Sequence, residues 1–448
     1  MSAIWWIRRD IRLQDNKTLQ EALKDPPILP VFILDPHLLS TAPELRLNFL
    51  FQNLRKLQED LQSRGSDLIV RRGRPLEALQ DLLEETGAES IIAEEDFTPY
   101  ARLRSVLVGG SLPLKLVQGQ LGAHPLAALK ANGKPYQVYT PFKKNWRVVV
   151  TGISSLPAPH KIPTIPDIQS DPIPPGKEHP LFPSGEKAAQ ARLAAFFNGP
   201  VEEYHHTRDR MDQEGTSKLS PYFHLGVLGL RTGLAQSLNS LEEGTGGEGT
   251  NIWLSELIWR EFYIHILFHF PEVRTQNFRS QYDGLRWRNN QGEFEAWKAG
   301  RTGYPIVDAG MRQLRETGWM HNRARMITAS FLVKHLLIDW RWGERWFRDC
   351  LLDGDLAANN GGWQWVAGTG TDAAPYFRIF NPILQSKKFD PKGHYIRRWV
   401  PELMDLDRST IHAPWEKEIK IEGYPAPIVD HKAARERALF AYQSAREN

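Results

Sequence analysis

The sequence predicts an α/β domain with a doubly wound, Rossmann-like parallel sheet, followed by a connector and an all-α domain. Three observations predict this class. Over about the first 120 residues, short apolar runs alternate with amphipathic stretches, as in parallel βαβ units. Residues 154–185 are rich in proline and lack an apolar period, as expected of a connector. After residue 185 the apolar period is helical almost throughout. We expect an α/β domain over 1–125, a connector over 126–185 and a helical domain over 186–448.

Five short apolar runs fit the strands of the predicted sheet. They are Ile4–Ile7, Ile28–Leu34, Asp67–Val70, Ser90–Ala93 and Leu114–Val117. The clearest helix between them ends near Gly65 and has one apolar face, made of Leu47, Leu50, Leu54, Leu57 and Leu61. No strand is followed by GxGxxG or by GKS/T, so the sheet lacks the usual loop for a dinucleotide phosphate.

The later helices have recognisable ends. Ser220 and Pro221 fit an N-cap and a first-turn residue. Pro305 begins a second helix and Gly318 ends it. The apolar face of that helix includes Val307, Met311 and Leu314. Residues 323–338 are apolar on most faces, which predicts a segment through the middle of the helical domain.

Composition excludes several classes of protein. The 448 residues are 41% hydrophobic and 24% charged, which is typical of a globular protein with a large core. The single cysteine, Cys350, rules out disulfides and cysteine-rich zinc sites, and we expect no metal site and a reducing, cytoplasmic setting. The start, MSAIWWIRRD, is too short an apolar run for a signal peptide, and no membrane span is expected.

Two stretches carry groups suited to ligands. GTSKLSPYF (215–223) places hydroxyls and a lysine before a helix, which suits a phosphate but also fits plain helix capping. In SELIWREFY (255–263), Glu256, Trp259, Arg260 and Tyr263 share one helical face. Because the opposite face is apolar, the polar face is either an ion-paired surface or the wall of a pocket.

The net charge of the chain is only +3, so nucleic-acid binding would need a local basic patch. Residues 312–348 contain eight Arg or Lys and three Asp or Glu. Four tryptophans lie among them, at positions 319, 340, 342 and 346. Basic groups with aromatic neighbours indicate phosphate contact and base stacking, and a solvated basic helix is the alternative.

The stretch DGDLAANNGGWQW (353–365) is too polar for a core helix and too aromatic for an ordinary loop. Its carboxylates and amides suit ribose hydroxyls or a heterocycle edge, and its glycines allow close approach of a flat ligand. The two tryptophans suit stacking or electron transfer. An irregular loop with an Asn-Gly turn is the alternative, but it leaves the tryptophans unexplained.

Together these stretches resemble the photolyase/cryptochrome family. The resemblance runs from WWIRRDIRLQDN to GYPAPIVDH and is densest over 253–403. The matching motifs there are RTGYPIVDAGMRQL, TGWMHNRARMITASFLVK, DGDLAANNGGWQW, GTDAAPYFRIFNP and KFDPKGHYIRRWVPEL. Within the family, the sequence is most similar to class I cyclobutane pyrimidine dimer photolyases.

The resemblance implies that the helical domain binds FAD, active in its reduced form, and contacts DNA. Arg325 and Asp353 match an ion pair beside the flavin ring, and Asn359 matches the residue opposite flavin N5. The positions that match flavin or phosphate contacts are Tyr204, Thr216, Ser217, Lys218, Leu219, Ser220, Arg260, Arg325, Asp353, Gly354, Asp355 and Asn359.

The resemblance also implies residues that act on damaged DNA. The positions matched to repair of a flipped-out dimer are Glu256, Asn322, Met326 and Asn359, with Trp259 and Trp365 as the apolar wall of its pocket and as DNA contacts. Arg323 and Arg378 match contacts to the DNA backbone. Trp287, Trp340 and Trp363 match, in that order, the chain that carries an electron from the surface to the flavin.

The implied activity is that of a carbon–carbon lyase that splits cyclobutane pyrimidine dimers with blue or near-ultraviolet light. Photolyases are among the enzymes that flip their target out of the duplex, and the damaged stacking of a dimer lowers the cost of extrusion. A cryptochrome-type photoreceptor with the same fold and FAD is the alternative, and a binding module without activity is a second. Asn359, Asn322 and Met326 favour repair, as does an end at Asn448 without a long signalling tail.

The resemblance further implies an antenna chromophore in the α/β domain. The run EEDFTPYARLR (94–104) departs from the folate pattern and looks nearer the deazaflavin pattern, with FMN or an empty site still open. We expect a monomer whose partner is UV-damaged DNA. Trp342 and Trp346 exceed the usual pattern and could either branch the electron path or pack.

Overall fold

The computed structural model describes residues 2–447. It groups the chain into two compact units, and each is described by itself. The first unit comprises Met1–Glu202 and Ser217–His269, and the second comprises Glu203–Thr216 and Phe270–Asn448. The domain boundaries expected from the sequence divide the chain differently from these units, and they stay a prediction.

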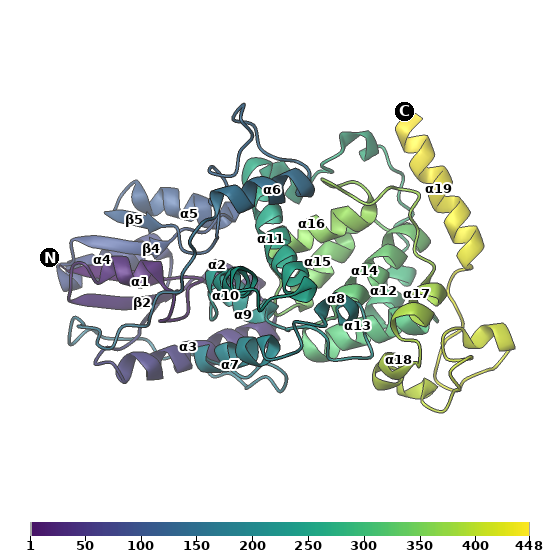
Figure 1. The fold of residues 1–448 in the computed structure, drawn as a ribbon, viewed down its shortest axis with the longest axis horizontal. Helices are drawn as coiled ribbons and strands as arrows, with labels where there is room; N and C mark the ends of the chain where they lie inside the picture. The colour runs from purple at the N-terminus through teal and green to yellow at the C-terminus, as the bar shows by residue number, and fades with distance from the viewer. Residues whose placement is uncertain (1, 448) are drawn as a thin grey trace. The chain divides into compact units, whose positions relative to one another are not determined.

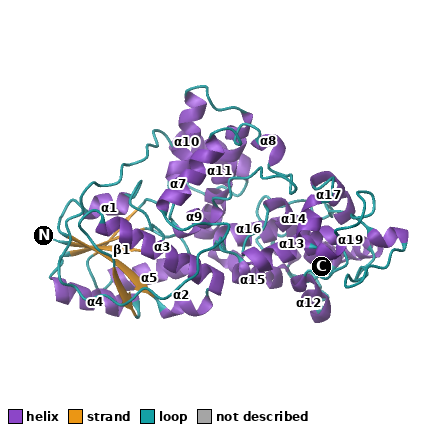
Figure 2. Cartoon of the chain, turned by 90° about the horizontal axis from the view of Figure 1, so that it is seen from below, coloured by secondary structure: helices purple, strands orange, loops and turns teal. Residues whose placement is uncertain are grey.

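The first unit contains a parallel sheet of five strands in the order β3-β2-β1-β4-β5. The strands are β1 (Ala3–Ile7), β2 (Ile28–Leu34), β3 (Ile69–Arg72), β4 (Ser90–Glu94) and β5 (Leu114–Val117). In Figure 2 they appear in orange, with α1 and α3 on one side and α4 and α5 on the other. The predicted doubly wound sheet is thus confirmed, with its central strand β1 buried along its whole length.

The third predicted strand begins two residues earlier than the observed one. The third strand was expected at Asp67–Val70, but it begins at Ile69. The Asp67 carboxylate instead accepts hydrogen bonds from the backbone N–H of Leu68 and the side chain of Gln58. Because that carboxylate is engaged locally, Asp67 lies before the ladder begins.

The helices of the first unit surround the sheet or follow it. They are α1 (Lys17–Ala22), α2 (Pro36–Thr41), α3 (Glu44–Gln62), α4 (Pro75–Thr86), α5 (Pro99–Gly109), α6 (Tyr139–Val149), α7 (Glu186–Phe197), α9 (Ser220–Leu225), α10 (Leu230–Glu242) and α11 (Glu248–His269). On α3, Leu54, Leu57 and Leu61 are buried as expected, whereas Leu47 and Leu50 are only half-buried. Phe49 and Phe51 take their place in the core.

The expected N-cap at Ser220 is wrong. Ser220 is the first helical residue of α9, and Leu219, which has no side-chain acceptor, is the N-cap residue. Pro221 does lie in the first turn, where its missing N–H costs nothing. The hydroxyl of Ser220 is therefore not used to cap this helix.

The second unit is helical, and Figure 1 shows its helices from α12 to α19 in green and yellow. They are α8 (Tyr204–Thr207), α12 (Gln291–Ala299), α13 (Pro305–Thr317), α14 (Asn322–Ser330), α15 (Trp340–Cys350), α16 (Leu356–Ala367), α17 (Pro382–Phe389), α18 (His394–Trp399) and α19 (His431–Glu447). Short 3-10 turns are η1 (Pro271–Arg274), η2 (Ser280–Tyr282), η4 (Pro401–Leu403) and η5 (Pro414–Lys417).

Helix α13 has the ends and the face that its sequence predicts. Pro305 begins it, and Gly318 ends it in the left-handed region at φ +60°. Val307, Met311 and Leu314 are each fully buried. The expected segment after it is also buried, but it is not one α-helix, because α14 passes into a π-helical turn, η3 (Phe331–His335).

Lys334 of η3 joins the end of one helix to the C-terminal helix. Its ammonium donates to the carbonyl oxygen of Ala367, the last residue of α16, at 2.9 Å. It also lies 3.5 Å from the ring centre of Tyr442 on α19. Burial holds the pKa of Lys334 well below its usual range. Between residues 2 and 447, no helix is both long and apolar enough to span a membrane.

Candidate functional site

Helix α11 carries the polar face that the sequence predicts in the first unit. Glu256, Trp259 and Arg260 are half-buried on one side of the helix. Leu257 and Phe262 are buried on the other side. A half-buried face on a helix whose opposite face is fully packed fits the wall of a pocket better than an ion-paired surface.

Glu261 holds this helix in place, and sequence reasoning missed it. Its buried carboxylate accepts hydrogen bonds from the backbone N–H of Gly122 at 2.6 Å and of Ala123 at 3.0 Å. It also accepts from the indole of Trp146 at 2.6 Å. Burial raises the pKa of this carboxyl, and the three donors offset its desolvation. No local pattern could have shown it, since all three partners are more than 100 residues away in sequence.

The hydroxyl-rich run before α9 does not serve as a helix cap. The Ser217 hydroxyl accepts from the indole of Trp253 at 3.3 Å. Lys218 adopts the left-handed region at φ +51°, a conformation uncommon for a residue with a side chain. Because α9 has no side-chain cap, plain capping does not explain the run, and a phosphate seat remains the interpretation of these groups.

A small polar pocket lies at the carboxyl ends of β1 and β4, where the strand order of the sheet reverses. Ligands of open α/β sheets bind at this kind of switch point. Arg12 and Glu94 face each other there at 3.4 Å, and burial raises the pKa of Glu94 to about 8. The lining residues are Arg9, Arg12, Glu94, Gln120, Phe223, Gly226, Leu228, Leu230 and Arg260. Three arginines in one pocket suit an anionic ligand.

In the second unit, the stretch 353–365 is mostly helical, so the expectation that it is too polar for a core helix is wrong. Helix α16 begins at Leu356, and the Asp355 carboxylate caps it by accepting from the N–H groups of Ala357 and Ala358, each at 3.1 Å. The expected ion pair between Arg325 and Asp353 is present at 2.9 Å. The loop Asp353–Asp355 therefore brings one carboxylate to a helix end and another to an arginine.

Asn359 is oriented by α15. Its amide nitrogen donates to the backbone oxygen of Glu344 at 2.9 Å and to the Glu344 carboxylate at 3.0 Å. Burial raises the pKa of Glu344. Both amide hydrogens are thus engaged on one side, which fixes the direction of the side chain.

Asn360 and Gln364, the polar residues of this stretch without an expected role, hold a neighbouring segment. Both donate to the carbonyl oxygen of Val273, at 3.0 and 2.9 Å. The Gln364 side-chain oxygen accepts from the N–H of Phe278 at 3.0 Å. These two buried amides satisfy backbone groups of residues 273–278 and so have a structural role.

The positions matched to damaged DNA in this unit lie on α14 and α16 or near them. Asn322 is exposed and its amide lies 3.9 Å from the sulfur of Met326, one turn along α14. Trp365 is half-buried, and the guanidinium of Arg378, an exposed residue, lies 6.0 Å from its ring centre.

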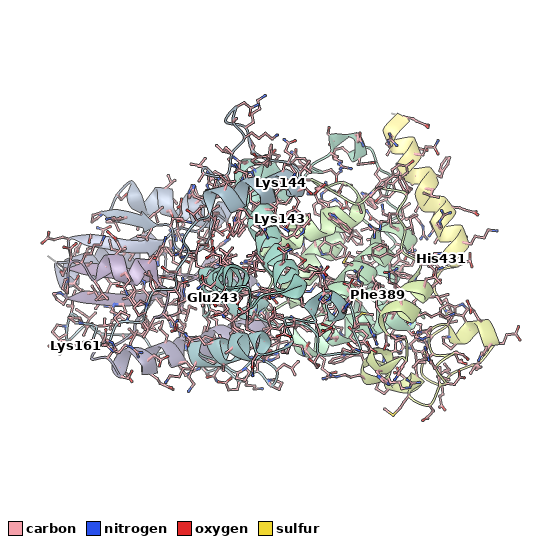
Figure 3. The ribbon with its side chains drawn as sticks, in the orientation of Figure 1. Lys143, Lys144, Lys161, Glu243, Phe389 and His431 are labelled. Atoms are coloured by element: carbon pink, nitrogen blue, oxygen red, sulfur yellow. The ribbon has the colours of Figure 1, made fainter. Side chains whose placement is uncertain are left out.

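Arg323 is more engaged than the sequence predicts. It forms two hydrogen bonds with the Asp209 carboxylate, at 2.7 and 3.2 Å. Its guanidinium lies 4.3 Å from the ring of Phe389, on α17, which Figure 3 labels. Any anion that binds Arg323 must compete with Asp209, a residue that sequence reasoning missed.

The three tryptophans expected to carry an electron differ in burial. Trp363 and Trp340 are fully buried, and the Trp340 indole donates to Asn277 at 2.9 Å. Trp287 is half-buried and meets the ring of Tyr442 edge-on at 6.3 Å. The two tryptophans nearer the flavin in the expected order are thus buried, and Trp287, at the expected surface end, is the more exposed one.

The extra tryptophans pack around α12. Trp342 meets Phe294 edge-on at 5.2 Å, and the ammonium of Lys298 lies 4.8 Å from the ring of Trp346. These contacts give both residues a packing role. A branched electron path through them stays a prediction.

Comparisons with known proteins agree with this fold. The model of the FAD-binding domain of DNA photolyase matches residues 253–444, and the DNA photolyase model matches residues 3–164. Proteins named deoxyribodipyrimidine photo-lyase from Agrobacterium fabrum and Escherichia coli are each 40% identical, over 99% of this chain and 98% of the relative.

Solved structures of similar fold cover nearly the whole chain. A bacterial class III photolyase from Agrobacterium tumefaciens has a TM-score of 0.90 and 38% identity, and covers 100% of this chain and 98% of its own. A Synechocystis cryptochrome has a TM-score of 0.89 and 30% identity, and the match covers 98% of this chain and 99% of the cryptochrome. An archaeal photolyase from Sulfolobus tokodaii, described with two FAD molecules, has a TM-score of 0.84 and 32% identity. The match covers 99% of this chain and 100% of the archaeal one.

The fold and the matching FAD-binding-domain model together define a flavoprotein with an α/β unit and a helical unit. The chain belongs to the photolyase/cryptochrome family. This confirms the family expected from the motifs, and residues 253–444 are its FAD-binding domain.

Proposed function

We propose that this protein is a deoxyribodipyrimidine photo-lyase that repairs cyclobutane pyrimidine dimers in DNA with blue or near-ultraviolet light. The observation that carries the proposal is the accessibility of the residues matched to the lesion. Glu256 and Trp259 share a half-buried helical face, and Asn322 and Met326 lie one turn apart on α14. Relatives of this chain carry the same name.

The residues present fit a bound FAD. The ion pair of Arg325 and Asp353 suits the polar edge of a flavin ring, and Asn359 keeps its amide oxygen as an acceptor. Arg260, which lines the pocket with two other arginines, suits the phosphates. We assign Tyr204, Thr216, Ser217, Lys218, Leu219, Ser220, Gly354 and Asp355 to the same cofactor. Reduced FAD, when bound, supplies the light-driven electron that opens the dimer.

The protein side chains prepare the lesion for that reaction. Flipping the dimer out of the duplex removes its base stacking, and the indoles of Trp259 and Trp365 replace that stacking. In its protonated form, Glu256 would donate a hydrogen bond to the dimer carbonyls, which become more negative as the dimer gains an electron.

Binding to DNA would begin with its phosphates. Arg378 is exposed and can meet a phosphate directly. Arg323 must exchange Asp209 for a phosphate or share the guanidinium between them. We expect binding in the dark to weaken steeply as salt is raised, because phosphate contacts release counterions.

A second chromophore is part of the proposal. We place it in the α/β domain, with deazaflavin, folate and FMN as the candidates. We further propose that the protein acts as a monomer in the cytoplasm and belongs to class I.

The test is repair of a defined lesion. The purified protein is reduced with its FAD and mixed with an oligonucleotide that contains one cyclobutane thymine dimer. Blue light should restore the two thymines, and the same sample kept in the dark should not change. No restoration in the light by a protein with fully reduced flavin would contradict the proposal and favour the cryptochrome-type photoreceptor.

A further inference from the structure

Helix α6 runs beside α11, antiparallel to it, within the first unit. The two helices are in contact, and Figure 3 labels Lys143 and Lys144 on α6. Successive rungs, each four residues apart, connect them. The rungs are Tyr139 with Trp259, Lys143 with Ser255 at 2.6 Å, and Arg147 with Asn251 at 2.5 Å. Residue numbers in these pairs rise along α6 and fall along α11, as expected of antiparallel helices. This face of α6 therefore follows the half-buried face of α11.

The first rung is a close ring stack. The rings of Tyr139 and Trp259 lie 3.7 Å apart between centres, with their planes only 7° from parallel. The Tyr139 hydroxyl donates to the backbone oxygen of Ser255 at 2.8 Å, one turn before Trp259. Phe262 meets the same indole edge-on at 5.6 Å and 78°. Tyr139 is thus tied to α11 at both its ring and its hydroxyl.

A second, deeper row of contacts joins the same two helices without Tyr139. Phe142 packs against Phe262 at 5.2 Å and against His265 at 5.1 Å. Trp146 donates to Glu261 at 2.6 Å. Phe142 and Trp146 are 1% and 0% exposed, so this row is the one that docks α6 onto α11. The Tyr139 ring also meets Phe262, at 5.9 Å, so its distinct contribution is its stack on Trp259.

We propose that Tyr139 is a positioning residue for the lesion pocket, acting through Trp259. The inference rests on the proposed function, in which Trp259 is a wall for the flipped dimer. A half-buried indole on a helix can adopt several rotamers, and a ligand must select one of them at a cost in binding. The stacked phenol covers one face of the indole and holds a single orientation before the lesion arrives. The wall is therefore prepared in the free protein, and stacking of the dimer on it costs less.

Lys143 lies near Glu256, the second residue of α11 expected to face the lesion. Its ammonium is held by Ser255, and its charge attracts Glu256, the next residue on α11. Helix α6 thus backs both lesion-facing residues of α11, although it lies in the segment expected to be a connector.

The test compares two substitutions on α6 in the reduced, FAD-bound protein. Tyr139→Leu removes the stack, and Phe142→Leu, the matched control, removes a more deeply buried ring that does not touch Trp259. Dark affinity is measured for an oligonucleotide with one thymine dimer and for the undamaged strand. Tyr139→Leu should weaken lesion binding about fivefold, the factor typical of losing one aromatic pair, and leave undamaged DNA unchanged. Phe142→Leu should lower the melting temperature more, yet bind the lesion like the parent.

Two further variants keep the outcome decisive. Tyr139→Phe keeps the ring and should retain lesion affinity within about twofold, since only the hydrogen bond to Ser255 is lost. In a Trp259→Leu background, Tyr139→Leu should have no additional effect on lesion affinity. If Tyr139→Leu does not fold, Tyr139→Met, whose flexible chain fills the same space, replaces it.

Three results would overturn the inference. One is lesion affinity of Tyr139→Leu equal to the parent's, and another is an equal loss in Phe142→Leu. The third is a full Tyr139→Leu effect in the absence of Trp259. Failure of the proposed function would look different, because the parent protein itself would then show no light-dependent repair.

Discussion

At the scale of single residues, the direction of Asn359 is set by the protein and not by a ligand. Its amide nitrogen has two hydrogens, and both are used on Glu344, at 2.9 and 3.0 Å. A carboxylate at this position would have no hydrogen to donate. It would also face the Glu344 carboxyl, whose pKa burial already raises. The amide is therefore required here for structural reasons as well as for its expected place near the flavin.

The first prediction concerns Asn359→Asp. The new carboxyl and Glu344 would share one proton, so the pKa of the pair would rise further in the folded state. A group with a raised folded pKa stabilises the fold at low pH and loses that contribution as pH rises through the folded value. We expect the unfolding free energy in urea to fall by about 1–3 kcal/mol more at pH 8 than at pH 5.

The control is the double variant Asn359→Asp, Glu344→Gln. With only one carboxyl left in the pair, the extra loss at pH 8 should shrink. A loss of equal size at both pH values in the single variant would show that the two carboxyls do not interact.

At the scale of elements, α16 combines structural and functional duties residue by residue. Asp355 caps it, Asn360 and Gln364 hold the segment 273–278, and Trp363 packs into a space left by Gly343 on α15. Asn359 and Trp365, which are half-buried, carry the proposed functional roles. A helix with so many partners tolerates polar residues because each buried amide and carboxylate has a hydrogen-bond partner of its own.

The second prediction concerns the cap. Asp355→Ala removes the acceptor for the N–H groups of Ala357 and Ala358 and should cost about 1 kcal/mol of unfolding free energy in urea. Asp355→Asn keeps a side-chain acceptor at the same position and should cost clearly less. If the two variants were equally stable, capping would not be the reason for an aspartate here.

The third prediction concerns the contact between α15 and α16. A Cβ on Gly343 would overlap the Trp363 ring, so Gly343→Ala should destabilise the protein by about 1–3 kcal/mol as the indole is displaced. Gly362→Ala is the matched control, because a Cβ there meets nothing within 4 Å and alanine favours a helix by up to about 1 kcal/mol.

Both glycine variants are measured by urea unfolding without added flavin. Tryptophan fluorescence would report the displaced indole in Gly343→Ala alone. Equal stability of the two variants would mean that α15 can move away from Trp363 at little cost.

At the scale of the whole molecule, the tryptophans of the second unit form a gradient of environments. The indole N–H of Trp363 has no hydrogen-bond partner among the described residues, and that of Trp340 donates to a neutral amide. Neither can readily give a proton to a base. Trp287 is half-buried, so water can reach it. A hole that moves outward along this order would be trapped at the exposed end, which suits the proposed path from the surface to the flavin.

The fourth prediction tests that path. Trp363→Phe should slow photoreduction of oxidised flavin at least about tenfold, yet leave repair by pre-reduced enzyme largely intact. Trp297→Phe is the control, because Trp297 lies 6.1 Å from Trp363 but outside the proposed chain. Absorbance of the flavin under blue light follows the rate. Loss of repair in pre-reduced Trp363→Phe, or equal slowing in Trp297→Phe, would show that Trp363 is misassigned.

Much of the fold could be predicted from local patterns. The five strands, the caps of α13 and the two faces of α11 follow from the spacing of apolar residues and from proline and glycine at helix ends. These signals lie within one or two turns of chain, so they can be read from sequence. Where two local signals conflicted, as in the polar and aromatic run that forms α16, the prediction failed because tertiary partners satisfied the polar groups.

The sequence by itself determined the class of fold, the family and the residue types available for chemistry. Only the tertiary structure decided which of those residues hold one another. It pairs Arg323 with Asp209, Asn359 with Glu344, and Trp259 with Tyr139. Periodicity and capping are set by neighbours in the chain, whereas these pairs depend on how helices pack. A contact between residues far apart in sequence leaves no period to read, and only packing brings such residues within reach.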